Sequence, residues 1–163
     1  MEIERKYLLK ELPENLKQYK YRKIEQGYLC HNPTIRIRKS DEDYILTYKS
    51  KFGLEPVEKG GPLVNNEVEL PLTEDAYQTL RGKTDGNMVY KTRYLIPLWD
   101  GLTAELDVFE GLLQGLLLVE VEFPDRQTAD DFCPPSWFGK DLSDDRRFTN
   151  YHLSKLSDLS ELG

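Results

Sequence analysis

The first six residues, MEIERK, place two glutamates and a lysine at every second position. In a β-strand this spacing puts Glu2, Glu4 and Lys6 on one face, because successive side chains point to opposite sides. Glutamate and lysine are poor strand formers, and two like charges on neighbouring positions of one face repel each other. A strand of this kind needs opposite charges, or a charged ligand, across from it.

Five further segments repeat this pattern of like-charged pairs that alternate with apolar residues. In TIRIRK, for example, Arg36 and Arg38 share one face of the strand, whereas the isoleucines share the other. A solvated strand face usually mixes polar residue types, but these pairs are all acidic or all basic within one strand. The charged faces, with Lys49 of LTYKS added, comprise the acids Glu2, Glu4, Glu67, Glu69, Glu105, Asp107, Glu120 and Glu122 and the bases Lys6, Arg36, Arg38, Lys49, Lys91 and Arg93.

If these faces meet in one enclosed space, their residue types favour a polyanion and a hard cation. Unpaired charges there would cost about several kcal/mol each, so they need partners, water or ligands. Clustered bases suit phosphate oxygens, which arginine contacts through two N–H groups at once. Clustered glutamates suit Mg²⁺ or Mn²⁺. A metal and bases around a polyanion form the general arrangement for phosphoryl transfer.

Alternation predicts eight strands, which are separated by turn residues such as Asn32-Pro33 and Asp100-Gly101. The predicted strands cover about residues 2–9, 24–30, 34–39, 43–50, 65–71, 88–96, 103–110 and 116–123. Helices are predicted at about residues 13–20, 73–83, 126–132 and 143–159. Thr73 and Ser143, each followed by acidic residues, are typical of helix starts.

Strands joined mostly by hairpins, with helices inserted or appended, predict an α+β fold. We expect an eight-stranded antiparallel β-barrel with helices packed outside. Such a barrel can hold one small ligand, so the charged faces would line a tunnel. The alternative is an ordinary β-sandwich whose charged faces meet solvent, because a half-buried strand normally alternates in this way. On the residues alone, the two folds rank nearly level.

The chain has 163 residues, which fits a single domain over 1–163, and a net charge of −7. This charge argues against general binding to nucleic acid or to anionic membranes, although clustered bases can still bind an anionic substrate. MEIERK lacks the order of a signal peptide, and no segment approaches the ~18 apolar residues of a membrane span. Two cysteines are too few for a disulfide framework, so we expect a cytoplasmic protein. His31 and His152 stand alone and are interpreted as surface residues.

Several motifs together resemble the CYTH family, also called the triphosphate tunnel metalloenzymes. MEIERK resembles the family's ExExK signature, and the similarity continues in family order across essentially the whole chain. The other segments that carry it are EQGYL, TIRIRKS, YILTYKS, NEVEL, KTRY, ELDVFEG, GLLLVEVEF and WFGKDLSDDRRFTN. The resemblance implies an eight-stranded antiparallel tunnel that binds a triphosphate and a divalent metal. It also implies a C-terminal helix that plugs one end.

The resemblance also assigns roles to individual residues. Lys91 with Tyr28 resembles a lysine–tyrosine pair that assists proton transfer. The glutamates that resemble the metal ligands are Glu2, Glu4, Glu120 and Glu122. The other acids, which we expect to orient the bases, are Glu67, Glu69, Glu105 and Asp107. The bases that resemble the triphosphate ligands are Lys6, Arg36, Arg38, Lys49 and Arg93, joined by Arg146 or Arg147 from the C-terminal helix.

Small bacterial family members with EIERK and QGYL, as in this chain, resemble the inorganic triphosphatases most closely. We therefore expect hydrolysis of inorganic triphosphate to diphosphate and phosphate, with Mg²⁺ or Mn²⁺ as the cofactor. Thiamine triphosphatase and class IV adenylate cyclase are alternative activities. A non-catalytic module that binds polyphosphate or nucleotides is a further alternative. The expected partner is triphosphate or another small polyphosphate, and the sequence is compatible with a homodimer.

Overall fold

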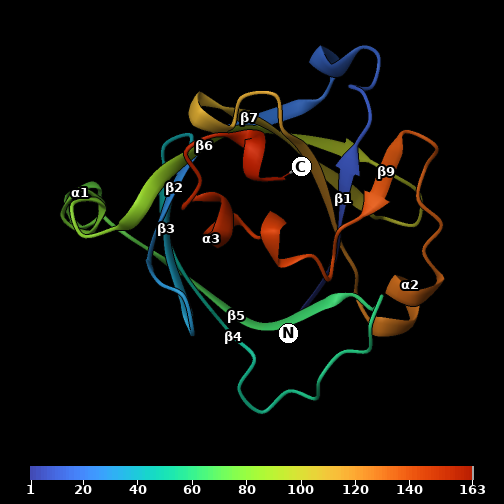
Figure 1. The fold of residues 1–163 in the computed structure, drawn as a ribbon, viewed down its shortest axis with the longest axis horizontal. Coiled ribbons are helices and arrows are strands. Elements are labelled where there is room, and N and C mark those ends of the chain that lie inside the picture. The colour runs from blue at the N-terminus through green and yellow to red at the C-terminus, as the bar shows by residue number, and fades with distance from the viewer. Residues whose placement is uncertain (163) are drawn as a thin grey trace.

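The computed structural model describes residues 1–162, in which nine strands form one sheet. The strands are β1 (Glu2–Leu9), β2 (Lys20–Cys30), β3 (Thr34–Ser40), β4 (Asp43–Ser50), β5 (Leu63–Pro71), β6 (Asp85–Pro97), β7 (Thr103–Glu110), β8 (Leu117–Glu122) and β9 (Phe138–Asp141). Their order is β5-β4-β3-β2-β6-β7-β8-β1-β9, and β1 also pairs with β5. This last pairing closes β1 to β8 into a barrel, while β9 lies outside against β1 (Figure 1).

The closed sheet confirms the predicted eight-stranded antiparallel barrel and excludes the sandwich. All eight predicted strands are present, and neighbouring strands are antiparallel throughout. The strands that most exceed the prediction are β2, which begins at Lys20, and β6, which covers Asp85–Pro97. The short strand β9 was not predicted. It extends the sheet by pairing with β1 at Tyr7 and Leu9.

Two predicted helices pack outside the barrel, namely α1 (Glu74–Arg81) and α2 (Arg126–Asp131) (Figure 1). Each begins after a residue whose side chain caps it. Thr73 accepts a hydrogen bond from a backbone N–H of the first turn of α1, and Asp125 does the same for α2. Within residues 1–162, no helix is both long and apolar enough to cross a membrane.

The predicted helix over residues 13–20 is wrong. Only a single 3₁₀ turn forms there, η1 (Leu16–Gln18), and strand β2 begins at Lys20. None of the η1 residues is buried. A short helix in water is unstable unless it buries an apolar face, and no such packing stabilises a longer helix in this segment.

A continuous helix over residues 143–159 is also wrong, because the C-terminal segment breaks into short turns. Asp145 and Thr149 explain the breaks, since each side chain accepts a hydrogen bond from a backbone N–H two or three residues later and so starts a new turn. Ser143, the predicted helix start, instead accepts a hydrogen bond from the backbone N–H of Lys6. The pieces are η3 (Arg146–Phe148), α3 (Asn150–Leu153) and η4 (Leu159–Leu162).

The main apolar core lies on the outer face of the barrel wall. Residues of β1, β7 and β8 that alternate with the charged ones pack there against the connections and α2. Among them, Leu106, Val119 and Val121 are completely buried. The apolar sides of these strands therefore face outward, and the charged sides are left to face the barrel interior.

The barrel interior itself has an apolar end and a charged end. Along β6, β7 and β8 the inward residues change from Val89, Phe109 and Leu118 at one end to acids and bases further along. The apolar end is filled by the C-terminal segment, which contributes Phe148 and Leu153 to the same buried cluster. In Figure 1 this segment lies across the middle of the barrel. It therefore closes one end of the interior.

Candidate active site

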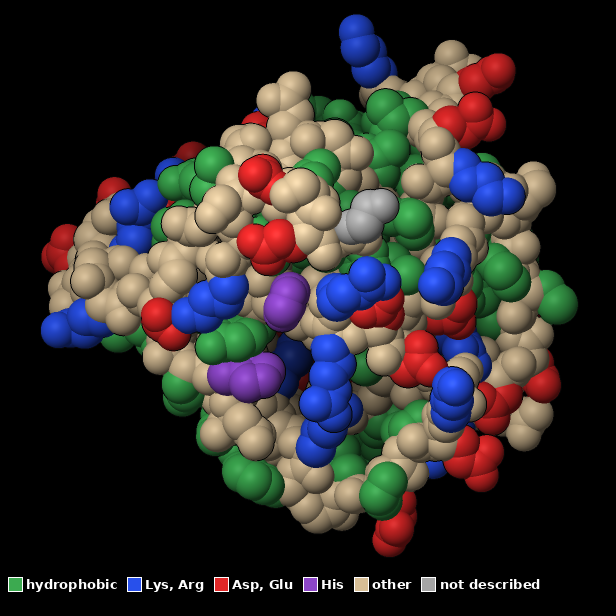
Figure 2. Space-filling model, in the orientation of Figure 1, with side chains coloured by type: hydrophobic (Ala, Val, Ile, Leu, Met, Phe, Trp, Pro, Cys, Tyr) green, Lys and Arg blue, Asp and Glu red, His purple; other side chains and the backbone are tan. Residues whose placement is uncertain are grey.

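The charged part of the barrel interior forms a cavity of about 610 Å³. Figure 2 looks into this hollow from the side of the C-terminal segment, where both histidines and several lysine or arginine side chains surround it. All residues of the alternating charged faces line it except Lys91 and Asp107, which are fully buried in the barrel interior. The lining set is Glu2, Glu4, Lys6, Arg36, Arg38, Lys49, Glu67, Glu69, Arg93, Glu105, Glu120 and Glu122. The predicted enclosed space is thus present.

Three of the glutamates form a compact carboxylate cluster. Glu2 and Glu4 come from β1, and Glu122 lies directly opposite Glu4 on β8. One carboxylate oxygen from each lies within 4.8 Å of the others. Burial and the neighbouring Glu120 raise the pKa of Glu4 well above its usual range, and burial with Glu105 and Glu2 raises the pKa of Glu122 to about 7. The raised pKa values show that the cationic groups nearby do not offset the burial and mutual repulsion of these carboxylates.

Glu120 lies beside the cluster but has cationic partners of its own. Its Oε1 is 3.6 Å from Lys6 Nζ and 4.0 Å from Arg93 Nη2. Burial alone would raise the pKa of Glu120, but Lys6 and Arg93 lower it well below its usual range. Glu120 is therefore ionised, and it holds two of the bases in place.

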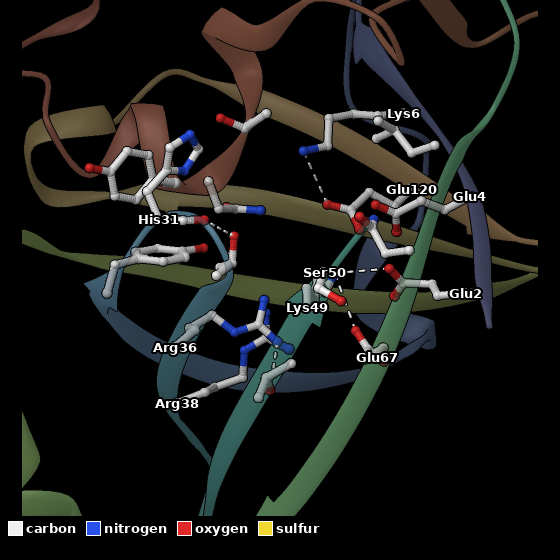
Figure 3. A pocket seen from close by; sticks show the side chains of 18 of the residues that line it. Glu2, Glu4, Lys6, His31, Arg36, Arg38, Lys49, Ser50, Glu67 and Glu120 are labelled. Carbon is white, nitrogen blue, oxygen red and sulfur yellow. Dashed lines mark hydrogen bonds and ion pairs between the residues drawn. The ribbon is translucent and has the colours of Figure 1, made fainter. Parts of the chain in front are cut away.

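Lys49 lies between two glutamates in the middle of the cavity (Figure 3). Its Nζ is 3.0 Å from Glu2 Oε1 and 3.2 Å from Glu67 Oε2. Burial opposes its charge, but the surrounding glutamates, Glu4 first, outweigh it and raise the pKa of Lys49. Glu2 Oε1 therefore has Lys49 as an ion-pair partner, and a carboxylate oxygen keeps a second lone pair for another partner.

Two arginines of β3 face the carboxylates across the cavity (Figure 3). Arg38 donates from Nε and Nη2 to Gln26 Oε1, at 2.9 and 2.7 Å. Arg36 donates from Nη2 to Thr47 Oγ1 at 3.0 Å, and its buried Nε has no partner within residues 1–162. Burial and Arg36 lower the pKa of Arg38 to about 9, which leaves it charged at neutral pH. The β3 side of the cavity therefore offers positive charge and, at Arg36 Nε, an N–H donor without a partner within residues 1–162.

Comparison with known proteins agrees with this geometry. The model of the CYTH domain matches residues 1–149. The chain belongs to the CYTH family. An inorganic triphosphatase of Nitrosomonas europaea is 38% identical over 157 residues, which is 94% of this CYTH chain and 96% of that protein. An inorganic triphosphatase of Acetivibrio thermocellus is 30% identical over 133 residues, or 80% and 78% of the two chains.

A solved structure supports the same assignment. The crystal structure of an inorganic triphosphatase superposes on this CYTH chain with a TM-score of 0.68 and 34% identity. The superposition covers 97% of each chain. The whole barrel, including the C-terminal segment, therefore has a counterpart in that structure.

Three of the four acids expected to orient bases lie next to bases in the CYTH chain. Arg93 contacts Asp107 through Nε and Nη2, at 2.7 and 2.9 Å, and Glu105 through Nη1 at 2.9 Å. Glu67 contacts Lys49, and Glu69 lines the cavity without an ion pair within residues 1–162. These contacts fix the direction of the guanidinium and ammonium groups.

Lys91 and Tyr28 are both buried, but they have different partners. Lys91 Nζ is 2.8 Å from Asp107 Oδ2 and donates to Asn150 Oδ1 at 3.3 Å. The Tyr28 hydroxyl accepts from Gln26 Nε2 at 3.2 Å. No hydrogen bond joins Lys91 to Tyr28 in the described part of the chain. Burial lowers the pKa of Lys91 to about 7, against the attraction of Asp107.

The two arginines predicted from the C-terminal segment lie in different places. Arg146 lines the cavity. Arg147 does not. Its side chain is half exposed, and it contacts Asp145 through Nη2 at 2.8 Å. Of the two, Arg146 is the one that can reach a ligand in the cavity.

Sequence reasoning missed several polar residues of the site. Gln26 connects Arg38 with Tyr28, and Asn150 connects the C-terminal segment with Lys91. Gln26 lies two positions before Tyr28 in EQGYL, so strand alternation places both on one face. Asn150 has no comparable signal, because its position depends on the irregular path of the C-terminal segment. His31 and His152 are exposed as expected, but both line the mouth of the cavity.

Proposed function

We propose that this chain is a metal-dependent inorganic triphosphatase, which hydrolyses linear triphosphate to diphosphate and phosphate. One observation carries the proposal: a carboxylate cluster and a set of bases face each other across one enclosed cavity. A simple anion-binding site needs the bases but not the carboxylates. The inorganic triphosphatase of Nitrosomonas europaea, which matches nearly the whole chain, adds support.

The bases hold the phosphate chain in the cavity. Arg36 offers a buried Nε that has no partner within residues 1–162, and Arg38 remains charged although it is buried. Arginine matches phosphate oxygens through pairs of N–H donors, whereas lysine acts as a point charge. The proposed substrate ligands are Lys6, Arg36, Arg38, Lys49, Arg93 and Arg146. Together they position the terminal phosphorus for attack by water.

Glu2, Glu4 and Glu122 fit a hard divalent cation, which we propose to be Mg²⁺ or Mn²⁺. Their oxygens converge and their pKa values are raised, although Lys49 lies beside Glu2. Both features are expected where several carboxylates lie close together with too few cations among them. When bound, the cation neutralises charge on the phosphates and orients the scissile group. Glu120 lies beside these residues and is a further candidate ligand.

Lys91 and Tyr28 are proposed to assist proton removal from the attacking water. A general base is effective when its pKa lies near the working pH, and the pKa of Lys91 is about 7. Tyr28 lines the cavity and Lys91 does not, so Tyr28 is the member of the pair that would contact the attacking water. Water then forms the new bond to phosphorus, the bond to the diphosphate group breaks, and the neutral amine of Lys91 accepts the proton that the water loses.

A substrate panel tests the proposal. Phosphate release is measured with tripolyphosphate, thiamine triphosphate and ATP, each with Mg²⁺ and with Mn²⁺. We expect the highest kcat/KM with tripolyphosphate. A binding module would bind tripolyphosphate without releasing phosphate, and a cyclase would form cyclic AMP from ATP. The Glu4→Gln variant is the negative control, and its activity should fall close to background while its fold persists.

A further inference from the structure

Arg5 lies on the opposite face of β1 from the residues of the cavity. Because side chains alternate along a strand, Glu4 and Lys6 face the interior, and the arginine between them faces outward. Its side chain is nevertheless only 10% exposed. A buried charge is costly unless it is paired and hydrogen-bonded. The partners of Arg5 therefore lie in the elements that cover the outer face of β1.

Arg5 contacts three separate outer elements. Its Nε donates to the backbone oxygen of Ala129 in α2 at 2.8 Å. Its Nη1 donates at 3.0 Å to the backbone oxygen of Gly60, in the connection between β4 and β5. The same Nη1 donates at 3.0 Å to Asp141 Oδ2 at the end of β9, which lies beside β1 on the outside of the barrel (Figure 1). One guanidinium thus joins three elements that are far apart in sequence.

Asp141 links Arg5 to the start of the C-terminal segment. Its other carboxylate oxygen, Oδ1, accepts from the backbone N–H of Ser143 at 2.8 Å and from Ser143 Oγ at 2.6 Å. Ser143 Oγ in turn accepts from the backbone N–H of Lys6 at 3.0 Å. Residues 141–143 are therefore held against β1 by a chain of hydrogen bonds that begins at Arg5.

A second path from Arg5 reaches the same segment. Gly60, whose oxygen accepts from Arg5, donates through its own N–H to Asp144 Oδ2 at 3.2 Å. Asp144 lies two residues before Arg146, which lines the cavity. Arg146 forms no ion pair within residues 1–162, so no carboxylate of this range fixes its side chain. Its position depends instead on the path of the backbone that precedes it.

We propose that Arg5 is a positioning residue, which holds the C-terminal segment so that Arg146 reaches the substrate. The inference rests on the proposed function and adds to it a residue outside the cavity. Two hydrogen-bond paths begin at one guanidinium, pass through Asp141 and Gly60, and end directly before Arg146. Substrate binding and reaction depend on geometry, so a small displacement of a binding group lowers the rate.

A double-mutant cycle between Arg5→Met and Arg146→Ala tests this role. Methionine keeps the apolar stem of the arginine but makes none of its hydrogen bonds. In the wild type, Arg5→Met should lower kcat/KM for tripolyphosphate about fivefold, mainly through a higher KM. In Arg146→Ala nothing is left to position, so the same substitution should lower kcat/KM by less than about twofold. A purely structural loss would lower it by the same factor in both backgrounds.

Asp141→Asn is a milder variant, which decides the question if Arg5→Met does not fold. The amide has one acceptor oxygen where the carboxylate has two, so it cannot accept from both Arg5 and Ser143. Asp141→Asn should lower kcat/KM about two- to threefold in the wild type. It should have no effect in the Arg146→Ala background.

Arg81→Met is the matched control. Arg81 of α1 also joins elements on the outside of the barrel, but at a different place. It donates from Nη2 to the Tyr90 hydroxyl of β6 at 3.0 Å, and its Nε is 3.5 Å from Glu25 Oε1 of β2. Its removal should change kcat/KM by less than about 1.5-fold, because these contacts do not lead to the C-terminal segment. Urea unfolding of each variant shows whether it is folded under the assay conditions.

The outcomes separate the two proposals. Equal factors in the two backgrounds overturn the positioning role, and so does an unchanged kcat/KM in folded Asp141→Asn and Arg5→Met. A loss of the same size in Arg81→Met also overturns it, because the effect is then general to outer contacts. If the wild type releases no phosphate from tripolyphosphate, the proposed function fails instead. The cycle is then measured with calorimetric Kd values for tripolyphosphate, and an absence of coupling between Arg5 and Arg146 in these values overturns the positioning role.

Discussion

Lys91 and Asp107 form a buried ion pair in the barrel interior, with 2.8 Å between Lys91 Nζ and Asp107 Oδ2. Arg93 holds the same carboxylate through two N–H groups. The Asp107 carboxylate thus forms ion pairs with both Lys91 and Arg93. Burial would raise the pKa of Asp107, but Arg93 and Lys91 lower it, so the acid stays ionised. Lys91 is the member of this group that titrates near neutral pH.

The wild type should gain stability relative to Lys91→Met as the pH rises above 7. The folded chain releases the Lys91 proton above about 7, whereas the unfolded chain keeps it up to the ordinary value of 10.5. In this window the unfolded state binds more protons, so the free energy of unfolding rises with pH. Urea titrations of both proteins between about pH 7 and pH 9 measure the difference in their free energies of unfolding. If this difference does not change with pH, the low pKa of Lys91 is wrong.

Glu122→Gln should lower kcat/KM for tripolyphosphate by at least about 100-fold, because the loss of a ligand costs more than the loss of a group behind it. It should also weaken the dependence of phosphate release on Mg²⁺ concentration. The matched control is Glu42→Gln, an exposed position outside the cavity, which should keep full activity. Full activity of Glu122→Gln would remove this residue from the proposed metal site.

Adjacent arginines of the C-terminal segment should behave differently. Arg146→Ala should lower kcat/KM by about tenfold or more, since a hydrogen bond to a charged group contributes about 1.5–3 kcal/mol. Arg147→Ala should change it by less than about twofold, because this arginine forms a surface ion pair with Asp145. Steady-state kinetics on the two variants measures the contrast. Equal losses would show that Arg147 also reaches the substrate.

Leu153→Ala should destabilise the fold by about 2–5 kcal/mol, because a buried leucine leaves a cavity when it is truncated. Leu153 is 1% exposed and lies in the cluster that fills the apolar end of the barrel. Leu112 is 56% exposed, so Leu112→Ala should cost less than about 0.5 kcal/mol. Urea unfolding of both variants provides the test, and a small effect at Leu153 would mean that the plug adds little stability.

The strands were predictable because they carry a strict two-residue period, so Glu4 with Lys6, and Arg36 with Arg38, had to share a face. The period alone left the barrel nearly level with a sandwich, and the resemblance to the CYTH family decided between them. The alternation also predicted that Glu67, Glu105 and Asp107 would face that interior, although their partners could not be assigned. The exact pairs depend on the stagger between strands, which alternation within one strand does not specify.

The C-terminal segment was less predictable. Its composition favours one helix, but Asp145 and Thr149 interrupt it by bonding to the backbone ahead of them. The choice between Arg146 and Arg147 depends on that irregular path, and so does the contact from Asn150 to Lys91. A helical period therefore gives no guide to which side chain enters the cavity.

The pairing of β1 with β5 and β8 has a consequence for how the chain folds. The first strand pairs with β5, which ends at Pro71, but it can pair with β8 only after most of the chain has been made, because β8 ends at Glu122. Contacts so distant in sequence form slowly. The carboxylates of β1 and β8 come together only when this pairing forms, and their mutual repulsion opposes it. A cation bound among these carboxylates would therefore stabilise the closed barrel as well as form part of the reaction site.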